Sequence, residues 1–310
     1  MPQSKWQSLP TEAINPASVS LDTAPVVDIV DLMVSEDRKV VAAVHRERER
    51  IVHGVEIVTQ AVRKGGRIIF VGAGTSGRLG VVEAAEMPPT FGTPPSLVQA
   101  VMAGGRDAVF QSKEGVEDDY EAGTRAVSRL GVSRKDVVIG VSASGMTPFV
   151  RGTFTRARRE GAKIIFVTNC ATPELAQFVD LTIAPVVGPE VIAGSTRLKA
   201  GTATKLVLNM LTTIAMVRVG KTYGNLMVDL QVGSEKLKDR ARRIIAIVTE
   251  LGTEDADALL GRAHGNVKAA IVMHKTRRSY PKAMALLKES HNSVREAIGE
   301  DLEDRLKSLL

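Results

Sequence analysis

Two stretches of the sequence place hydroxyl side chains directly after short apolar runs. One is VGAGTSGR, which starts at position 71, and the other is VSASGMTP, which starts at position 141. An apolar strand, a glycine-rich turn and a helix start together offer backbone N–H groups to an anion. Hydroxyl groups at the same place add further donors. We therefore expect both turns to bind one phosphate, through Thr75, Ser76, Gly77, Ser142, Ser144, Gly145 and Thr147.

Other interpretations of these turns remain. Ser and Thr often cap helices without binding a ligand, although two hydroxyl-rich turns favour a ligand. Gly72, Gly74 and Gly77 also fit the G-x-G-x-x-G spacing of a dinucleotide site. Such a site needs an acidic residue at the end of the next strand, and here Asp107 lies beyond two glycines. A P-loop is excluded because G-x-x-x-x-G-K-[ST] is absent.

Two acidic clusters lie near these turns in the sequence. Glu83 and Glu86 share one helix face, and we expect that helix to end before Pro88. Glu86 then lies at a helix C-terminus, where the dipole disfavours a negative charge and keeps the carboxyl protonated. Glu117 lies near the expected start of a helix, where the dipole favours the anion. A carboxyl pair in different environments suits general acid–base catalysis; Glu83 and Glu114 are the local rivals.

Composition excludes several classes of protein. The chain has 310 residues and one cysteine, Cys170, so neither a disulfide framework nor a cysteine-rich metal site is possible. An aromatic content of 4% argues against stacking platforms for nucleic acid, and we expect no nucleic-acid partner. The net charge of +6 favours a small anionic substrate. Because the sequence lacks a signal peptide and a run of about 18 apolar residues, we expect a cytoplasmic protein without membrane contact.

The central part of the chain alternates between strand-like and helix-like segments. The five strand-like runs are RIIFVGA, LVQAVMAG, DVVIGVSA, KIIFVTN and LTIAPVV. Short runs rich in Val and Ile are typical of strands covered on both faces, so the pattern predicts an α/β fold with a doubly wound, parallel, five-stranded sheet. In such a sheet, ligands bind at the carboxyl ends of the strands.

Helical segments flank this sheet in the sequence. Residues 1–25 are expected to form an extended arm, and residues 28–64 two helices. Residues 195–220 predict a helix of about five turns, apolar enough to be buried in the core or against a second subunit. Beyond residue 231 only helices are expected. We therefore place one domain at 1–235 and a small all-helical domain at 236–310.

The segments GTSGR and SASGMTP resemble the phosphosugar-binding loops of sugar isomerase (SIS) domains. Further segments narrow the resemblance to one family within these domains. They are PTEAINPAS, EAAEMPPTFG, EGVEDD, GSTRLKAGTATKLVLNMLTT and GNLMVDL. In this order they resemble the N-acetylmuramic acid 6-phosphate etherases, from about residue 10 to the C-terminal helices. The regulatory protein of glucokinase is similar in part.

The resemblance implies an SIS-type, flavodoxin-like fold and cleavage of the D-lactyl ether at C3 of N-acetylmuramic acid 6-phosphate. The products are N-acetylglucosamine 6-phosphate and D-lactate, and no metal or redox cofactor is needed. By position, Glu86 is implied as the proton donor to the leaving lactate. Glu117 is implied as the base at C2 and later as the group that activates water.

The resemblance also implies a homodimer with shared active sites. The segment GPEVIAGSTRLKAG then lies near the sugar, with Ser195 and Lys199 as binding residues, although Ser195 is equally suited to cap the following helix. His264 and His274 are candidates for opening the sugar ring. Two alternative functions remain open, an aldose–ketose isomerase of the SIS class and a sugar-phosphate-binding regulator, neither of which needs both glutamates.

Overall fold

The computed structural model describes residues 9–308, so the first eight residues of the expected N-terminal arm lie outside the described part. The chain divides into two units. The first comprises the chain through Ala85 together with residues 96–212, and the second comprises residues 86–95 and the chain from residue 213 onward. The units have other boundaries than the predicted domains 1–235 and 236–310, and those domains remain a prediction.

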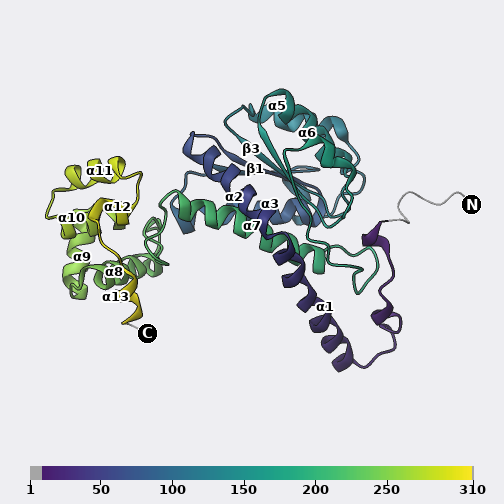
Figure 1. Ribbon diagram of the computed structural model, residues 1–310, viewed down its shortest axis with the longest axis horizontal. Coiled ribbons are helices and arrows are strands. Elements are labelled where there is room, and N and C mark those ends of the chain that lie inside the picture. Colours follow the sequence, from purple (N-terminus) through teal and green to yellow (C-terminus); the bar gives the residue numbers. More distant parts are fainter. Residues whose placement is uncertain (1–8, 309–310) are drawn as a thin grey trace, which may run out of the picture. The chain divides into compact units, whose positions relative to one another are not determined.

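A parallel five-stranded sheet forms the centre of the first unit, as the sequence predicts (Figure 1). Its strands are β1 Ile68–Gly72, β2 Val98–Met102, β3 Val137–Val141, β4 Lys163–Val167 and β5 Leu181–Ile183. Their order in the sheet is β2-β1-β3-β4-β5. Every residue of β1 and β3 is buried, which is the condition of strands covered on both faces.

Helices cover both faces of this sheet. The helices of the first unit are α1 Val26–Arg46, α2 Arg48–Arg63, α4 Asp107–Phe110, α5 Tyr120–Leu130 and α6 Pro148–Arg159, with short 3₁₀ turns at Pro10–Glu12, Pro16–Ser18 and Glu174–Phe178. Helices α5 and α6 lie together, and α6 packs on β1, β3 and β4. Phe154 of α6 meets Phe166 of β4 edge to face at 5.4 Å between ring centroids. Helix α2 packs on β1, β3 and β5.

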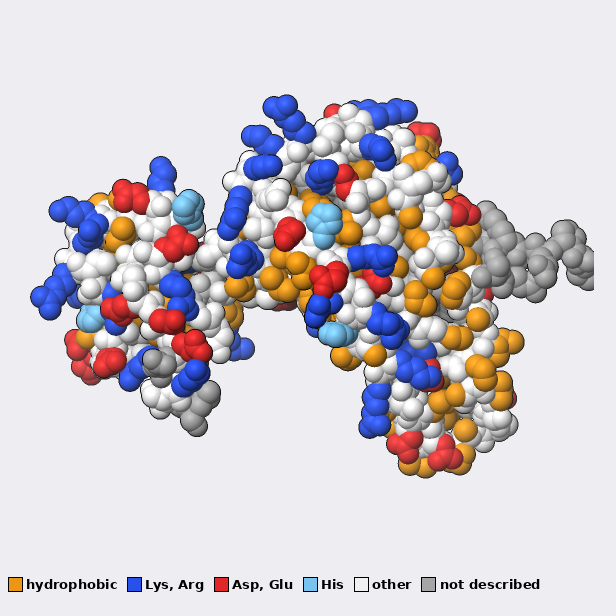
Figure 2. Space-filling model, in the orientation of Figure 1, with side chains coloured by type: hydrophobic (Ala, Val, Ile, Leu, Met, Phe, Trp, Pro, Cys, Tyr) orange, Lys and Arg blue, Asp and Glu red, His pale blue; other side chains and the backbone are white. Residues whose placement is uncertain are grey.

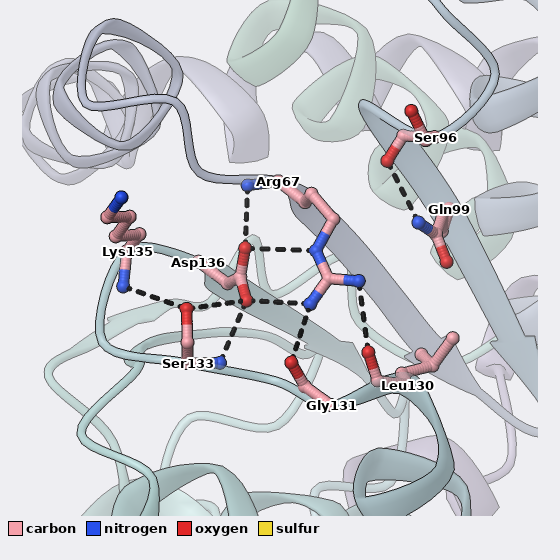
Figure 3. A network of polar contacts seen from close by, with 8 residues as sticks. All are labelled: Arg67, Ser96, Gln99, Leu130, Gly131, Ser133, Lys135 and Asp136. Carbon is pink, nitrogen blue, oxygen red and sulfur yellow. Dashed lines mark hydrogen bonds and ion pairs between the residues drawn. The ribbon is translucent and has the colours of Figure 1, made fainter.

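An ion pair closes the amino ends of the two central strands (Figure 3). The Asp136 carboxylate precedes β3 and accepts from the Arg67 backbone N–H at 2.8 Å and from its guanidinium at 2.9 and 3.1 Å. It also accepts from the backbone N–H of Ser133 at 2.8 Å. Asp136 is 3% exposed, and the bonds from Arg67 and Ser133 lower its pKa despite the opposing effect of burial. This network stabilises the end of the sheet opposite the candidate site.

We predict that Asp136→Asn lowers the free energy of unfolding by about 2 kcal/mol at pH 7, because the donors on Arg67 lose a charged acceptor. The folded-state pKa of Asp136 is depressed, so its contribution is complete above an unfolded pKa of about 3.9 and is lost as the pH falls through the folded value. Urea unfolding should therefore show a gap between the two proteins at pH 7 that narrows below pH 4. A constant gap would contradict the assignment.

Two helices pass from one unit into the other. Helix α7, Lys199–Arg218, is the predicted long apolar helix, and α3 runs Gly74–Phe91. Among the described helices, α7 alone has the length and hydropathy of a membrane span, and 56% of that segment is buried inside the protein, as in a core helix. Its buried apolar side chains are Ala200, Ala203, Val207, Leu208, Leu211, Ala215 and Met216.

The expectation that α3 ends before Pro88 is wrong. The helix continues through Pro88 and Pro89 to Phe91, although neither proline has an N–H to donate. Met87 and Phe91 on the same segment are buried, so tertiary packing outweighs the two lost hydrogen bonds. Gly92, with a φ of +60°, then ends the helix.

The rest of the second unit is helical, as the sequence predicts beyond residue 231. Its helices are α8 Glu235–Thr249, α9 Thr253–Arg262, α10 Val267–Thr276, α11 Tyr280–Glu289, α12 Val294–Ile298 and α13 Glu303–Lys307. Their apolar faces meet in one core. Lys268, 3% exposed, donates from Nζ to Asp229 and to the carbonyl oxygen of Asn292, so a buried ion pair ties three segments of this unit together.

Candidate active site

The first hydroxyl-rich turn links β1 directly to α3. Gly72 and Gly77 lie in close contact, since a Cβ on Gly77 would come within 2.7 Å of the Gly72 carbonyl oxygen. The start of α3 therefore packs against the end of its own strand, and only glycine fits. Thr75 and Ser76 lie half-buried in the first helical turn, where the free N–H groups of a helix start are available.

The second turn, between β3 and α6, holds its hydroxyls together. Ser142, 3% exposed, lies 2.7 Å from Thr147 and 3.3 Å from Ser144, measured between side-chain oxygens. Gly145 has a φ of +82°, and a Cβ there would meet Pro173 at 2.7 Å, so this position requires glycine. The structure thus brings together three of the predicted hydroxyl groups at one point.

The two turns leave the sheet side by side. Gly72, the last residue of β1, is paired with Val141, the last residue of β3. In the observed strand order, the chain winds one way from β1 and the other way from β3, and ligands of open α/β sheets bind at this switch point. The geometry agrees with the prediction that both turns serve one anion, which itself remains a proposal.

We predict that Ser142→Ala weakens binding of N-acetylglucosamine 6-phosphate about tenfold, because one hydroxyl donor to the phosphate is lost. Isothermal titration calorimetry would measure the change. Ser128→Ala is the matched control, since the Ser128 hydroxyl donates to the Thr124 carbonyl oxygen of its own helix. Equal affinity of the two variants would contradict a phosphate role for Ser142.

Glu117 is anchored at the start of α6. Its carbonyl oxygen accepts from the backbone N–H of Phe149 at 2.9 Å, so the loop that carries Glu117 is attached to the helix that follows the second turn. Helix α5 begins only at Tyr120, with Asp119 as its N-cap. Glu117 thus precedes the helix rather than lying in its first turn.

The expected dipole stabilisation of a Glu117 anion is wrong. Burial, followed by the neighbouring charges of Asp118 and Glu114, raises the pKa of Glu117. The side chain still presents surface to solvent. A carboxyl group with a raised pKa ionises closer to neutrality and is a stronger base once ionised.

A cavity of about 140 Å³ separates this loop from the first turn. Its lining residues are Ala73, Gly74, Arg78, Met102, Ala103, Ala108, Ser112, Lys113, Glu114, Gly115, Val116 and Glu117. The cavity thus joins the start of α3 to the Glu117 loop within the first unit. Its lining holds two basic residues, Arg78 and Lys113, and two acidic ones, Glu114 and Glu117, so it suits a polar guest.

Glu86 lies on α3 five residues before the helix ends, not at its C-terminus, so the helix-dipole argument for a protonated Glu86 is wrong. Its side chain is exposed, and it belongs to the second unit, whereas Glu117 belongs to the first. The rival Glu83 is buried and accepts from Asn209 at 2.5 Å and from the Thr212 hydroxyl. These bonds tie α3 to α7, so the Glu83 carboxylate serves a structural contact.

The segment before α7 is organised by Glu190, which belongs to the quoted segment GPEVIAGSTRLKAG but was not predicted to cap the helix. Both carboxylate oxygens of Glu190 accept from the first N–H groups of the helix, at 3.0 Å from Lys199 and 2.8 Å from Ala200. Glu190 therefore caps α7, and Ser195 lies four residues outside the helix. Thr196 and Arg197 lie in the same connecting segment.

The Lys199 side chain is buried. Its ammonium pairs with Glu36 of α1, and the two side chains are 1% and 3% exposed. The bonds to Lys199 and Lys39 lower the pKa of Glu36 to about 2, although burial alone would raise it. A binding role for Lys199 remains a prediction, and its contacts favour a structural one. No pattern around Glu36 in the sequence indicated this pair.

The two histidines predicted as candidates for ring opening, His264 and His274, lie in the second unit. No cluster of three or more His, Cys, Asp or Glu suited to a metal occurs among residues 9–308. His264 packs its ring against Tyr280 at 4.7 Å between centroids, and His274 lies on α10; both belong to the second unit. Their proposed part in ring opening has no contact in support.

Two family models match parts of the chain. Residues 50–158 match the N-terminal SIS domain of the glucokinase regulatory protein, and residues 116–214 match the SIS domain. Among solved structures, the phosphoheptose isomerase of Neisseria gonorrhoeae is similar with a TM-score of 0.49 and 19% identity, over 62% of this chain and 98% of that one.

Curated relatives match along almost the whole chain. The N-acetylmuramic acid 6-phosphate etherase of Salinibacter ruber is 51% identical over 95% of both chains. That of Picosynechococcus is 45% identical over 93% of this chain and 96% of its own, and that of Clostridium acetobutylicum is 46% identical over 95% and 98%. The chain therefore belongs to the N-acetylmuramic acid 6-phosphate etherase family of SIS-domain proteins.

Proposed function

We propose that this protein is a carbon–oxygen lyase that cleaves the D-lactyl ether of N-acetylmuramic acid 6-phosphate with water. N-Acetylglucosamine 6-phosphate and D-lactate are the products. The observation that carries the proposal is the attachment of the Glu117 loop to the first residues of α6, the helix that follows the Ser142 turn. This attachment holds the backbone of Glu117 beside the helix that follows the turn suited to a phosphate.

The reaction requires one group that removes a proton and another that gives one. In the open-chain sugar C1 is an aldehyde, so the C2 proton is acidic and Glu117 removes it. The electrons left on C2 then expel the lactate oxygen from C3, and Glu86 protonates that oxygen as it leaves. Water then adds to C3 of the resulting unsaturated aldehyde and gives one proton to Glu86, while C2 regains a proton from Glu117. Glu117 holds the C2 proton at this stage, so Glu86 rather than Glu117 takes the proton of the water. Each carboxyl group ends in its starting state, and no electrons are gained or lost.

The chemical class of each residue fits its role. Thr75, Ser76 and the hydroxyls of the second turn hold the phosphate and fix the position of C2 relative to Glu117. Positioning of this kind supplies much of the rate enhancement in enzymes that act on anchored substrates. Glu86 is a proposal from its position in the family motif, supported by its exposed side chain and by the buried, fully bonded state of Glu83.

We predict that kcat/KM falls as the pH is lowered through the raised pKa of Glu117, because only the ionised carboxylate accepts the C2 proton. The acid limb of the profile should lie above the value of 4.5 from which the group is shifted. Rates measured at saturating and low substrate between pH 4 and 8 test this. An activity that is flat down to pH 4 would contradict the role of Glu117 as base.

Release of D-lactate and N-acetylglucosamine 6-phosphate in equal amounts tests the proposed function directly. A regulator that only binds sugar phosphates is the second candidate, favoured by the match of residues 50–158 to a regulatory protein's domain. It would bind the substrate and release nothing. An isomerase would move a proton between C1 and C2 and leave the ether intact.

We infer that the protein acts in the cytoplasm as a homodimer with shared active sites. An apolar surface along α1 supports the dimer (Figure 2): Val26, Val27, Val30, Met33, Val34 and Val41 are each at least 37% exposed. Exposed apolar patches of this kind often mark sites of protein–protein interaction. Sedimentation equilibrium should give twice the chain mass, and a Val30→Glu, Val34→Glu variant should give the single mass. A monomeric native protein would contradict the inference.

A further inference from the structure

One of the two cations that line the cavity has no carboxylate partner. Lys113 pairs with Asp107 at 3.3 Å and bonds to the Gly104 carbonyl oxygen. Arg78, on the second turn of α3, donates only to neutral carbonyl oxygens, from Nε to Val109 at 2.8 Å and from Nη2 to Ala108 at 2.9 Å. Within residues 9–308 no carboxylate lies within ion-pair distance of its guanidinium.

The two backbone bonds fix the Arg78 guanidinium and leave donors unused. A guanidinium has five N–H donors, and Nη1 of Arg78 has no hydrogen-bond partner among the described residues. The side chain is half-buried, so its charge is partly removed from water. A fixed, partly dehydrated guanidinium without a counterion favours a planar anion that accepts two bonds.

The substrate of the proposed reaction carries two anionic groups. The phosphate on C6 is assigned to the hydroxyl-rich turns, which leaves the carboxylate of the lactyl group on C3. Glu117 acts on C2, the neighbouring carbon, and it shares the cavity with Arg78 and Gly74. A substituent of C3 is therefore within reach of this cavity.

We propose that Arg78 binds the carboxylate of the lactyl ether, and this assignment rests on the proposed function. Arg78 then distinguishes the substrate from the sugar product, which keeps the phosphate but has only a hydroxyl at C3. It also holds the leaving group by its far end while the bond between C3 and oxygen breaks. Lys113, already neutralised by Asp107, is less suited to this role.

Two substrates that differ in one charge test the assignment. One is N-acetylmuramic acid 6-phosphate, and the other is its carboxamide, in which the lactyl carboxylate is replaced by an uncharged amide of the same shape. We expect Arg78→Gln to lower kcat/KM for the acid about 10- to 100-fold and for the amide less than about threefold, since the lost bonds involve a charged group only in the acid. Arg78→Lys should keep part of the preference for the acid.

Arg106→Gln provides the control, because Arg106 is exposed, precedes the same short helix α4 and lies outside the cavity lining. Equal losses for acid and amide would show that Arg78 only supports the backbone at Ala108 and Val109, and would overturn the proposal. Weaker binding of N-acetylglucosamine 6-phosphate to Arg78→Gln would assign Arg78 to the phosphate and overturn it as well.

Failure of the proposed function and failure of the carboxylate assignment give different experimental results. If the native protein releases no lactate from the acid, the proposed function is contradicted. The carboxylate assignment is then decided by calorimetric binding of the acid and the amide to the native protein and to Arg78→Gln. Loss of the native preference for the acid in the variant supports the assignment, and an unchanged preference overturns it.

Discussion

Glu86→Gln and Glu117→Gln should each lower kcat by about 100-fold or more while N-acetylglucosamine 6-phosphate still binds. The amide keeps the shape of the carboxyl group but neither takes up the C2 proton nor transfers a proton to the lactate oxygen. The phosphate is held by other residues, so affinity for the sugar product should change little. Single-turnover kinetics and calorimetry measure the two quantities on the same preparations.

The matched control is Glu121→Gln, an exposed glutamate in the first turn of α5 that lies close to Glu117 in the sequence. It should retain nearly full activity. The two variants should also differ from each other, since an acid is needed only for the departure of lactate. A substrate with a more acidic leaving alcohol should recover activity in Glu86→Gln and not in Glu117→Gln. Near-native turnover of either variant would remove its assigned role.

Lys199→Met should lower the free energy of unfolding by about 3–5 kcal/mol, because it leaves the Glu36 carboxylate buried without its main partner. Replacing both residues, as Glu36→Met with Lys199→Met, should cost less than the sum of the single changes, since no uncompensated charge remains. Urea unfolding of the four proteins at pH 7 gives the coupling energy. The result separates the structural role of Lys199 from the predicted role in substrate binding.

Lys163→Met is the comparison, since Lys163 pairs with Asp180 at the surface, where the two side chains are 61% and 34% exposed. An exposed pair contributes about 0–1 kcal/mol, so this variant should unfold almost as the native protein does. If Lys199→Met were as stable as the native protein but bound N-acetylglucosamine 6-phosphate weakly, Lys199 would be a substrate ligand after all. That outcome would contradict the buried ion pair as its main function.

The sheet was predictable because its strands are buried on both faces. Such strands are continuous apolar runs, and each of the five predicted runs holds a strand. The hydroxyl-rich turns were also predictable, since they follow β1 and β3 directly in the chain. That Ser142 and Thr147 meet at 2.7 Å, and that Gly72 and Val141 are paired, required the register of the sheet.

The end of the helix that carries Glu86 and the environment of Glu117 were harder to predict from the sequence. Proline normally ends a helix, yet α3 continues past Pro88 because Met87 and Phe91 are buried, and such packing involves residues distant in sequence. The raised pKa of Glu117 likewise depends on burial that no local pattern reports.

Residues that act across long separations left no sequence signal at all. Glu36 meets Lys199 across 163 positions. Arg78 belongs to the recognised GTSGR segment, but its lack of a carboxylate partner became evident only from its contacts with the backbone at Ala108 and Val109.

The central claim is that a phosphate-anchored sugar loses lactate from C3 by elimination and regains a hydroxyl there from water. Turnover of N-acetylmuramic acid 6-phosphate in water enriched in ¹⁸O tests it most directly, with both products analysed by mass spectrometry. The account predicts the heavy oxygen on C3 of N-acetylglucosamine 6-phosphate and none in the hydroxyl of D-lactate. Heavy oxygen in that lactate hydroxyl, with an unlabelled C3, would mean that the other side of the ether oxygen is broken and would contradict it.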